Sequence, residues 1–230
     1  MYFSLITPAE GRERDAVHER LDGPYADHQW LWRWFPTDQG APRDFLFRQR
    51  EADGIPRYHV VSRRAPVDQM GAWRAQIRSY APSLQEGDRL HFELRANPTV
   101  RHGRDGKSKR HDVVMEAKKK MLAERGFSRW ADWTGDDKPS LQTLQHAACS
   151  SWLQRRGTAL GFSLEADTLM VDGYVQHQEK PDRALCFSTV ELSGQMTVTE
   201  PQAFQAALVG GIGSAKAFGC GLLLVRRMDA

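Results

Sequence analysis

The sequence predicts an α+β protein built from two halves with mainly antiparallel sheets. Short segments of alternating character recur along the chain, for example around Leu90, Phe92 and Leu94. Segments with apolar residues at helical spacing lie between them. The stretch 80–88 (YAPSLQEGD) places Pro and Gly between two such runs and is the natural boundary. Apolar residues make up 40% of the 230 residues, with seven Trp, so each half can bury a modest core.

The first half opens with a predicted strand at residues 2–7. Residues 12–34 then carry apolar side chains at helical spacing. Gly23 and Pro24 interrupt this spacing. Because Pro suits the first turn of a helix, one helical segment is expected to end here and another to start at about Tyr25.

Three further elements complete the first half. Residues 43–49 and 57–62 alternate in the manner of a hairpin. The pattern of residues 68–80 predicts a second helix, with Asp68 as its N-cap.

The second half repeats the pattern more loosely. A basic turn near Gly103 and Gly106 follows its first strand, and Asp172-Gly173 predicts the type I′ turn of a hairpin. Two ferredoxin-like (RRM-like) units would fit this order, one over 1–85 and one over 89–230. The remaining predicted elements are strand 89–96, helix 114–125, helix 140–156, strands 184–192 and 195–199, helix 201–209 and strand 221–227.

Composition bounds the environment of the chain. The three Cys are far apart and form no CxxC pair, which favours a reducing compartment and argues against a disulfide framework or a zinc cluster. No run of 18 apolar residues occurs, and the N-terminal segment lacks the features of a secretory signal. The expected location is therefore the cytoplasm, with no membrane partner.

Positive charge is concentrated in one segment. The net charge of the whole chain is only +3, yet residues 95–125 contain ten Lys or Arg against four Asp or Glu. Such a local excess is a plausible phosphate-binding surface. A solvated helix face with a charged loop tip explains the same charges equally well, and both interpretations stay open.

Tyr25 and His28 are three residues apart and share a face if they lie on a helix, whereas Arg33 converges with them only if the helix ends nearby. Histidine suits either proton-transfer role in RNA cleavage, Tyr can donate a proton, and Arg can bind phosphate oxygens. On these residues alone, ordinary packing of Tyr25 and solvation of Arg33 are the better explanation. The other His residues show no metal-ligand spacing, and no clustered acidic pair suits a two-metal nuclease.

Residues 210–223 (GGIGSAKAFGCGLL) are rich in Gly but are not a nucleotide-binding motif. They lack the GxGxxG spacing, and Lys216 is followed by Ala217 rather than Ser or Thr. A loop whose backbone approaches another surface closely is the better interpretation.

Taken together, Tyr25-x-x-His28-x-x-Leu31-Trp32, residues 43–47 (RDFLF), residues 94–98 (LRANP) and residues 211–223 resemble the signatures of the CasE family. They occur in the family's order and span almost the whole chain. Members of this family are metal-independent endoribonucleases that process CRISPR transcripts in type I-E systems.

The resemblance implies a tandem ferredoxin-like fold, no cofactor, and cleavage of a CRISPR repeat hairpin that leaves a 5′-hydroxyl and a 2′,3′-cyclic phosphate. It also implies that the chain stays on its product as a subunit of the type I-E surveillance complex. The catalytic residues would be His28, Tyr25 and Arg33, although the family often has Lys at the last position. The RNA-binding residues would be Arg95, Asn97, Arg101, Lys107, Lys109, Arg110, His111, Gly213 and Lys216.

Two other functions remain compatible with the sequence. One is a structured-RNA-binding module without catalysis. The other is a structural subunit that meets RNA only through protein partners, with Trp30 and Trp34 as possible contacts. Substitution of His28 by Ala separates an enzyme from a binder.

Overall fold

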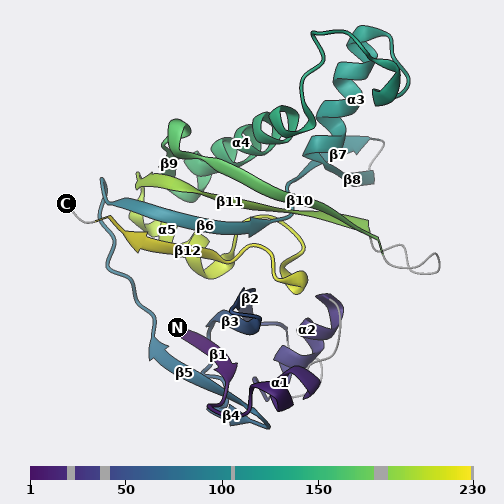
Figure 1. The fold of residues 1–230 in the computed structure, drawn as a ribbon. Helices are drawn as coiled ribbons and strands as arrows, with labels where there is room; N and C mark the ends of the chain where they lie inside the picture. Colours follow the sequence, from purple (N-terminus) through teal and green to yellow (C-terminus); the bar gives the residue numbers. More distant parts are fainter. Residues whose placement is uncertain (20–23, 37–41, 105–106, 179–185, 229–230) are drawn as a thin grey trace. The chain divides into compact units, whose positions relative to one another are not determined.

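The computed structural model describes the chain except residues 20–23, 37–41, 105–106, 179–185 and 229–230 (Figure 1). Contacts between Cα atoms group it into two compact units. Unit 1 consists of Met1–Leu84 with Gln205–Leu224, and unit 2 of Gln85–Phe204 with Val225–Ala230. The predicted domain limits, 1–85 and 89–230, stay a prediction. Among the described residues, no helix has the length and apolar character needed to cross a membrane.

Unit 1 contains an antiparallel sheet in the order β2-β3-β1-β5-β4. The break expected at Gly23-Pro24 agrees with two separate helices, the second of which begins at Pro24. The elements of this unit are β1 (Tyr2–Pro8), α1 (Glu13–Glu19), α2 (Pro24–Trp32), β2 (Phe45–Ala52), β3 (Ile55–Ser62), β4 (Gln69–Met70) and β5 (Trp73–Ser79).

The helix predicted over 68–80 is wrong, because this segment forms the two strands β4 and β5. Gly71 has a φ of 58°, a left-handed conformation that ends β4 and starts the tight return to β5. Trp73 is fully buried, but five of the six residues after it in β5 are polar or exposed. Buried and exposed residues therefore alternate only weakly in this strand, and such a sequence can be mistaken for one with helical spacing.

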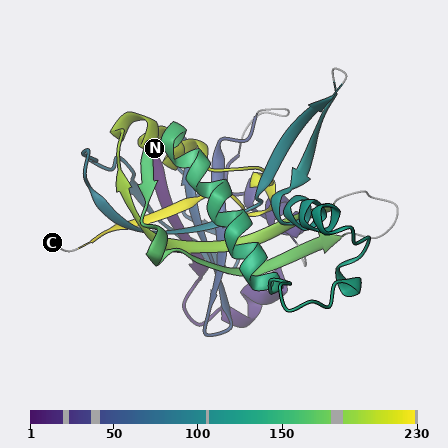
Figure 2. The same ribbon diagram turned by 90° about the horizontal axis from the view of Figure 1, so that it is seen from above.

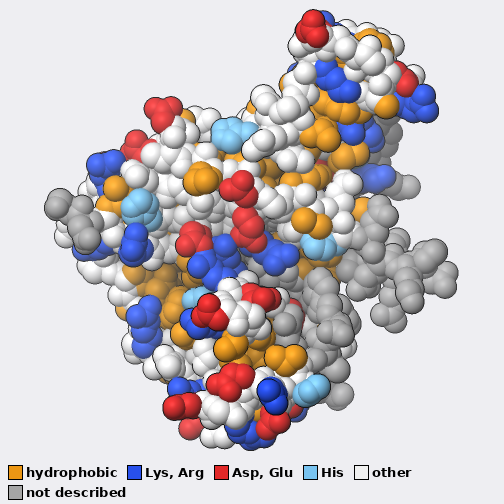
Figure 3. Space-filling view, in the orientation of Figure 1, with side chains coloured by type: hydrophobic (Ala, Val, Ile, Leu, Met, Phe, Trp, Pro, Cys, Tyr) orange, Lys and Arg blue, Asp and Glu red, His pale blue; other side chains and the backbone are white. Residues whose placement is uncertain are grey.

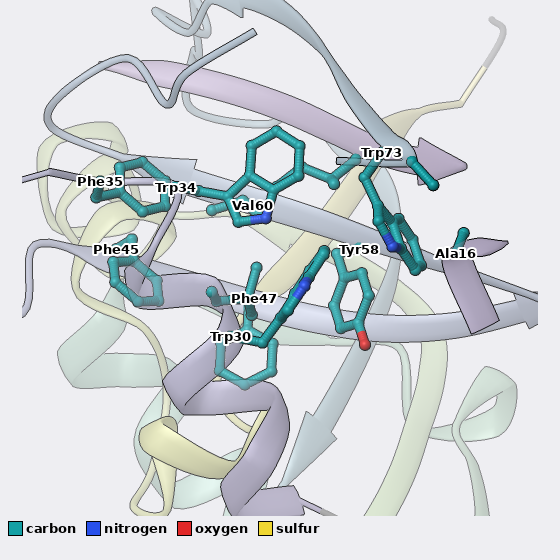
Figure 4. Packing of buried hydrophobic residues seen from close by; sticks show 12 residues of the cluster. Ala16, Trp30, Trp34, Phe35, Phe45, Phe47, Tyr58, Val60 and Trp73 are labelled. Atoms are coloured by element: carbon teal, nitrogen blue, oxygen red, sulfur yellow. The ribbon is translucent and has the colours of Figure 1, made fainter. Parts of the chain in front are cut away.

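The core of unit 1 is aromatic. Trp30 and Trp34 lie in it with exposed fractions of 2% and 0%, so these indoles are packing residues rather than surface contacts. Trp30 packs against Tyr58 and Trp73 at ring-centroid distances of 5.0 and 4.8 Å. Figure 4 shows these rings from the α2 segment facing side chains of the sheet. Buried aromatic rings of this size hold α2 firmly on the sheet.

Unit 2 has a sheet in the order β10-β11-β6-β12, with antiparallel β10–β11 and β11–β6 pairs. Two helices lie between β6 and β10 in the chain and one lies between β11 and β12, so helices connect the strands of this sheet as in a ferredoxin-like unit. The α+β, antiparallel fold class is thus confirmed. Its elements are β6 (Arg89–Ala96), β7 (Thr99–Arg104), β8 (Lys107–Asp112), α3 (Val113–Arg125), α4 (Leu141–Leu160), β9 (Phe162–Leu164), β10 (Met170–Gln178) and β11 (Cys186–Val198), with short 3-10 turns at Trp130–Asp132 and Ala166–Thr168. The residues of α5 (Pro201–Gly210) and β12 (Leu223–Arg227) are divided between the two units, and the 3-10 turn Lys216–Phe218 (η3) belongs to unit 1.

Two local predictions for unit 2 are wrong. Asp172-Gly173 is not a hairpin turn but lies inside β10, where the register shifts in a bulge between Asp172 and Val175. Gly173 has a φ of 60° there. A positive φ favours Gly in a bulge as it does in a turn, so the sequence alone does not distinguish the two. The two strands expected at 184–192 and 195–199 form the single strand β11.

Helix α4 crosses one face of the unit 2 sheet, and the β7–β8 hairpin projects beyond the sheet (Figure 2). Leu90, Phe92 and Leu94 of β6 are buried with Trp152 and Leu153 of α4, as the alternation of β6 predicts. The hairpin therefore follows a strand whose inner face is buried.

Candidate active site and nucleic-acid interface

Helix α2 is fixed on the unit 1 sheet at its first turn. Asp27 is only 5% exposed, and the Tyr58 hydroxyl of β3 donates to its Oδ1 at 2.6 Å. Trp30 and Leu31 of the same helix are also buried. These contacts leave His28 on the half-buried side of α2.

His28 is held by aromatic neighbours. The Trp32 indole Nε1 donates to His28 Nε2 at 3.1 Å, and the two residues are one helical turn apart. The His28 ring lies 6.4 Å from the Phe45 ring between centroids. Burial, and then the positive charge of Arg43, lower the pKa of His28 below its usual value. The imidazole is therefore neutral at neutral pH and able to accept a proton.

Arg43 is the residue of this site that the sequence analysis did not single out. It lies just before β2, its guanidinium carbon stands 5.9 Å from the Phe45 ring centroid, and its charge acts on both His28 and Lys216. Arg43 is the first residue of the RDFLF motif at residues 43–47, which contributed to the family resemblance but gave no role for Arg43 itself.

The position of the Arg43 segment is fixed by the residue that follows it. Arg64 forms a two-pronged ion pair with Asp44, at 2.7 Å to Oδ2 and 3.0 Å to Oδ1. Arg64 also donates to the Pro36 carbonyl at 2.8 Å. The hydrogen bond from Arg64 is the main reason that the pKa of Asp44 is lowered. The Asp44–Arg64 ion pair thus holds the segment next to Arg43 in place.

The Gly-rich loop belongs to unit 1 and packs on β2, as expected of a loop whose backbone approaches another surface closely. Gly211 has a φ of 73°, and a Cβ there would lie 2.8 Å from Leu46 Cδ1. A Cβ at Gly219 would lie 3.2 Å from Phe47 Cε2. Glycine is required at Gly211 for both its conformation and its contact.

This packing brings Lys216 to the neighbourhood of Arg43. The Lys216 ammonium donates to the Gly210 carbonyl at 2.6 Å. Burial and the charge of Arg43 lower the pKa of Lys216. Gly213 lies in the same loop with a φ of 85°. Unit 1 therefore gathers a neutral imidazole and two cationic side chains, a combination suited to a phosphodiester.

The structure gives less information on the side chains of Tyr25 and Arg33, the other two predicted catalytic residues. Tyr25 lies in the first turn of α2, but its side chain is outside the described residues. Arg33 follows the last residue of α2 and is exposed, with its backbone N–H donating to the Trp30 carbonyl at 3.2 Å. Both assignments stay predictions.

The basic segment forms the expected hairpin. In the β7–β8 register, Arg101 is opposite Arg110 and His102 is opposite Lys109. Arg101, Lys109 and Arg110 are all exposed. His111 is half-buried, with its ring 5.3 Å from that of His102. Lys107 pairs with Arg104 in the backbone, and its side chain is outside the described residues. Figure 3 shows Lys and Arg side chains on the surface over α3 and this hairpin.

The base of the hairpin is anchored to unit 2 by buried polar groups. Asn97 is 5% exposed, and its Nδ2 donates to the Ser188 carbonyl at 2.6 Å. This contact gives the Asn97 amide a structural partner, and contact with RNA from Asn97 stays a prediction. Trp152 Nε1 and Arg156 both donate to the Thr99 carbonyl at 3.1 Å.

Asp112 closes the other strand of the hairpin. Its carboxylate caps α3 by accepting from the Met115 N–H at 2.8 Å, and it also accepts from the hydroxyls of Tyr174 and Ser188. Arg95, in the strand before the hairpin, is paired with Glu191 at 3.7 Å across β6 and β11. The hairpin strands are thus fixed at both ends of their base.

No group of three or more His, Cys, Asp or Glu residues in the described part of the chain is arranged to hold a metal ion. Cys149 and Cys220 are buried and Cys186 is exposed, and burial raises the pKa of the Cys149 thiol to about 12. In the described part of the chain, the site consists of the His28 imidazole and the cationic side chains of Arg43 and Lys216.

Comparisons with known proteins agree with this architecture. The chain is 27% identical over 226 residues to the CRISPR system Cascade subunit CasE of Escherichia coli, covering 97% of this chain and 98% of that protein. It is 29% identical over 227 residues to the CRISPR-associated endoribonuclease Cse3 of Thermus thermophilus, covering 91% and 93%.

Solved structures share the fold. Cse3 bound to a 19-nucleotide RNA has a TM-score of 0.68 at 22% identity, with 98% of both chains covered. Cas6e from Escherichia coli has a TM-score of 0.60 at 22% identity, with 99% of this chain and 100% of that chain covered. The protein-family model described as CRISPR associated protein matches residues 1–227. The chain therefore belongs to this family of CRISPR associated proteins.

Proposed function

We propose that this protein is an endoribonuclease that cleaves the hairpin of CRISPR repeat RNA without a metal ion. The single observation that carries the proposal is the grouping in unit 1 of His28 on α2, Lys216 of η3, the turn that contacts α2, and Arg43, whose charge acts on both. Two relatives also support the proposal, one named as an endoribonuclease and the other as a Cascade subunit. Cse3, which has the same fold, bound to a 19-nucleotide RNA supports RNA as the class of substrate.

The proposed reaction needs proton transfer and neutralisation of charge. The O2′–H bond breaks and its proton moves to the base, while O2′ bonds to phosphorus and the P–O5′ bond breaks. His28 is the proposed base, because its lowered pKa leaves it neutral. Tyr25 is the proposed proton donor to O5′, since a Tyr hydroxyl with an ordinary pKa near ~10 is protonated at neutral pH.

Arg43 and Lys216 are proposed to stabilise the negative charge that develops on the phosphorane. A guanidinium can bind two phosphate oxygens at once, and an ammonium adds a point charge. Both side chains are partly buried, so water screens them less than it screens surface charges. Arg33 would add a further positive charge if the bound strand reaches the end of α2.

Specificity is proposed to come from the β7–β8 hairpin. The narrow major groove of RNA limits base readout, so most contacts should be made to phosphates. The exposed residues Arg101, Lys109 and Arg110 are proposed to make these contacts. Their sequence neighbours Arg95, Lys107 and His111 are proposed to contribute further contacts. The product would stay bound, which suits a subunit of the type I-E surveillance complex.

The test is cleavage of a labelled CRISPR repeat hairpin in EDTA. A matched substrate carries one 2′-deoxy sugar just before the cut. Cleavage of the first RNA and not of the second, with 2′,3′-cyclic phosphate ends, is the expected result. Tight binding without cleavage of either would support a non-catalytic RNA-binding module instead.

A further inference from the structure

The hydrogen bond between Trp32 and His28 has a defined direction. An indole N–H is only a donor, so the nitrogen that it contacts must present a lone pair. The contacted atom is His28 Nε2, at 3.1 Å from Trp32 Nε1. In a neutral imidazole one nitrogen carries the proton and the other the lone pair. The proton of neutral His28 therefore lies on Nδ1.

The orientation of Trp32 is set by packing. Its ring meets that of Phe45 nearly edge-on, at 5.4 Å between centroids and an interplanar angle of 78°. Phe45 in turn stacks on Phe35 at 4.7 Å and 14°. Both Phe rings are buried. Because the indole packs on Phe45 in this way, its N–H is directed at His28 Nε2 in the RNA-free protein.

We propose that Trp32 is a positioning residue that holds His28 as the Nδ1-protonated neutral tautomer, ready to accept a proton at Nε2. This inference deepens the proposed function and depends on it for its catalytic meaning. The lone pair of Nε2 is the one that takes the 2′-hydroxyl proton as O2′ bonds to phosphorus. The RNA hydroxyl takes the place of the indole N–H at that nitrogen when the proton is transferred.

The electrostatic surroundings of His28 act in the same direction. Arg43, before β2, disfavours an imidazolium ion. Lys216 lies at the start of η3, the turn that packs against α2, and is a further cation in this neighbourhood. A donor to Nε2 stabilises the neutral ring as well, because protonation would remove the acceptor. Loss of the Trp32 N–H should thus change both the tautomer and the titration of His28.

The test is a long-range ¹H–¹⁵N NMR spectrum of ¹⁵N-histidine-labelled protein without RNA. Comparison with His28→Gln identifies the His28 signals. The wild-type chain is expected to show the proton on Nδ1. In Trp32→Phe, which keeps an aromatic ring beside Phe45, the proton should redistribute toward Nε2 and His28 should titrate at higher pH.

Single-turnover cleavage supplies the second readout. Trp32→Phe should slow cleavage about five- to tenfold, the worth of one hydrogen bond, with the acidic limb of the pH profile moved upward. Trp34→Phe is the matched control, because that buried indole packs on Trp30 at 5.6 Å and its loss affects packing. It should leave the His28 tautomer unchanged.

Two results would overturn the inference. One is a wild-type spectrum with the proton on His28 Nε2, which needs no variant and holds even if Trp32→Phe fails to fold. The other is a folded Trp32→Phe protein with an unchanged tautomer and pH profile. Because the spectrum is recorded without RNA, an Nδ1 proton together with absent cleavage would count against the proposed function and not against the role of Trp32 in setting the tautomer.

Discussion

The Asp27 carboxylate and the Tyr58 hydroxyl lie 2.6 Å apart inside the core of unit 1, and they join the first turn of α2 to the middle of β3. Asp27 immediately precedes His28 in the chain. A buried carboxylate is costly unless it accepts hydrogen bonds, so this contact stabilises the helix in one position. The orientation of His28 thus depends on Tyr58, a residue of the sheet that is 30 positions away in the sequence.

Removal of the Tyr58 hydroxyl should destabilise the fold. Tyr58→Phe keeps the ring and leaves the buried Asp27 with one donor fewer, at an expected cost of about 1–3 kcal/mol. Chemical denaturation monitored by Trp fluorescence measures this loss. Tyr80→Phe is the control, since Tyr80 follows β5 and its ring packs on that of Phe3 at 5.7 Å between centroids. Equal stability of the two variants would contradict the anchoring role of Tyr58.

Substitution of His28 should separate cleavage from binding. His28→Ala removes the proposed base and should lower single-turnover cleavage by about 10²–10⁴-fold, the range found for proton-transfer groups. The Kd for the repeat hairpin should stay within about threefold, because the proposed RNA contacts lie mainly on the hairpin. His18→Ala, on the exposed side of α1, should cleave normally. A His28→Ala protein with full activity would support the non-catalytic alternative.

Arg43 should control the titration of His28. Its charge disfavours the imidazolium ion and lowers the pKa of His28, so Arg43→Ala should raise that pKa. If His28 is the base, the rate falls as pH drops through this pKa, and the acidic limb should therefore move to higher pH in the variant. Cleavage should also slow about 10²-fold from the loss of charge stabilisation. An NMR titration of His28 and a pH–rate profile measure the two effects.

The control for Arg43 is Arg14→Ala, which removes an exposed charge from α1. It should change neither the pKa of His28 nor the rate. If Arg43→Ala slows cleavage without moving the acidic limb, His28 is not the group whose protonation limits the rate.

The sequence predicted the fold class because the β6 alternation, the Pro24 helix start and the Gly-rich loop each have one strong physical interpretation. It failed at 68–80, where β5 lies next to the edge strand β4 and Trp73 is the one buried residue of β5. Asp172-Gly173 was misassigned since a bulge and a turn both favour a positive φ at Gly. These choices depend on strand pairing, which a local pattern does not contain.

The site shows the same division. His28 and Lys216 could be named from the sequence because they lie in recognisable motifs. Arg43 could not be assigned a role from spacing, since it is 15 positions from His28 and lies beyond the end of the helix that carries His28. The Trp32 hydrogen bond depends on a side-chain rotamer that packing on Phe45 decides. Residues brought together by tertiary packing are those that sequence patterns leave out.

The exposed cations of the hairpin should determine how RNA binding depends on salt. Arg101, Lys109 and Arg110 are exposed on β7 and β8, and each phosphate contact releases counterions. Replacing all three by Ala should reduce the slope of log K against log [KCl] by about 2 to 3, roughly 0.7–1 for each contact. Fluorescence anisotropy with the repeat hairpin at several KCl concentrations gives this slope.

The matched control is Lys119→Ala with Lys120→Ala, because these exposed residues of α3 belong to the same basic segment. If the hairpin is the phosphate-binding surface, this double variant should keep nearly the wild-type slope. If instead the α3 variant loses slope and the hairpin variant does not, the RNA lies along α3. Equal losses in both would mean that the excess charge attracts RNA as a diffuse field, with no phosphate held at the hairpin.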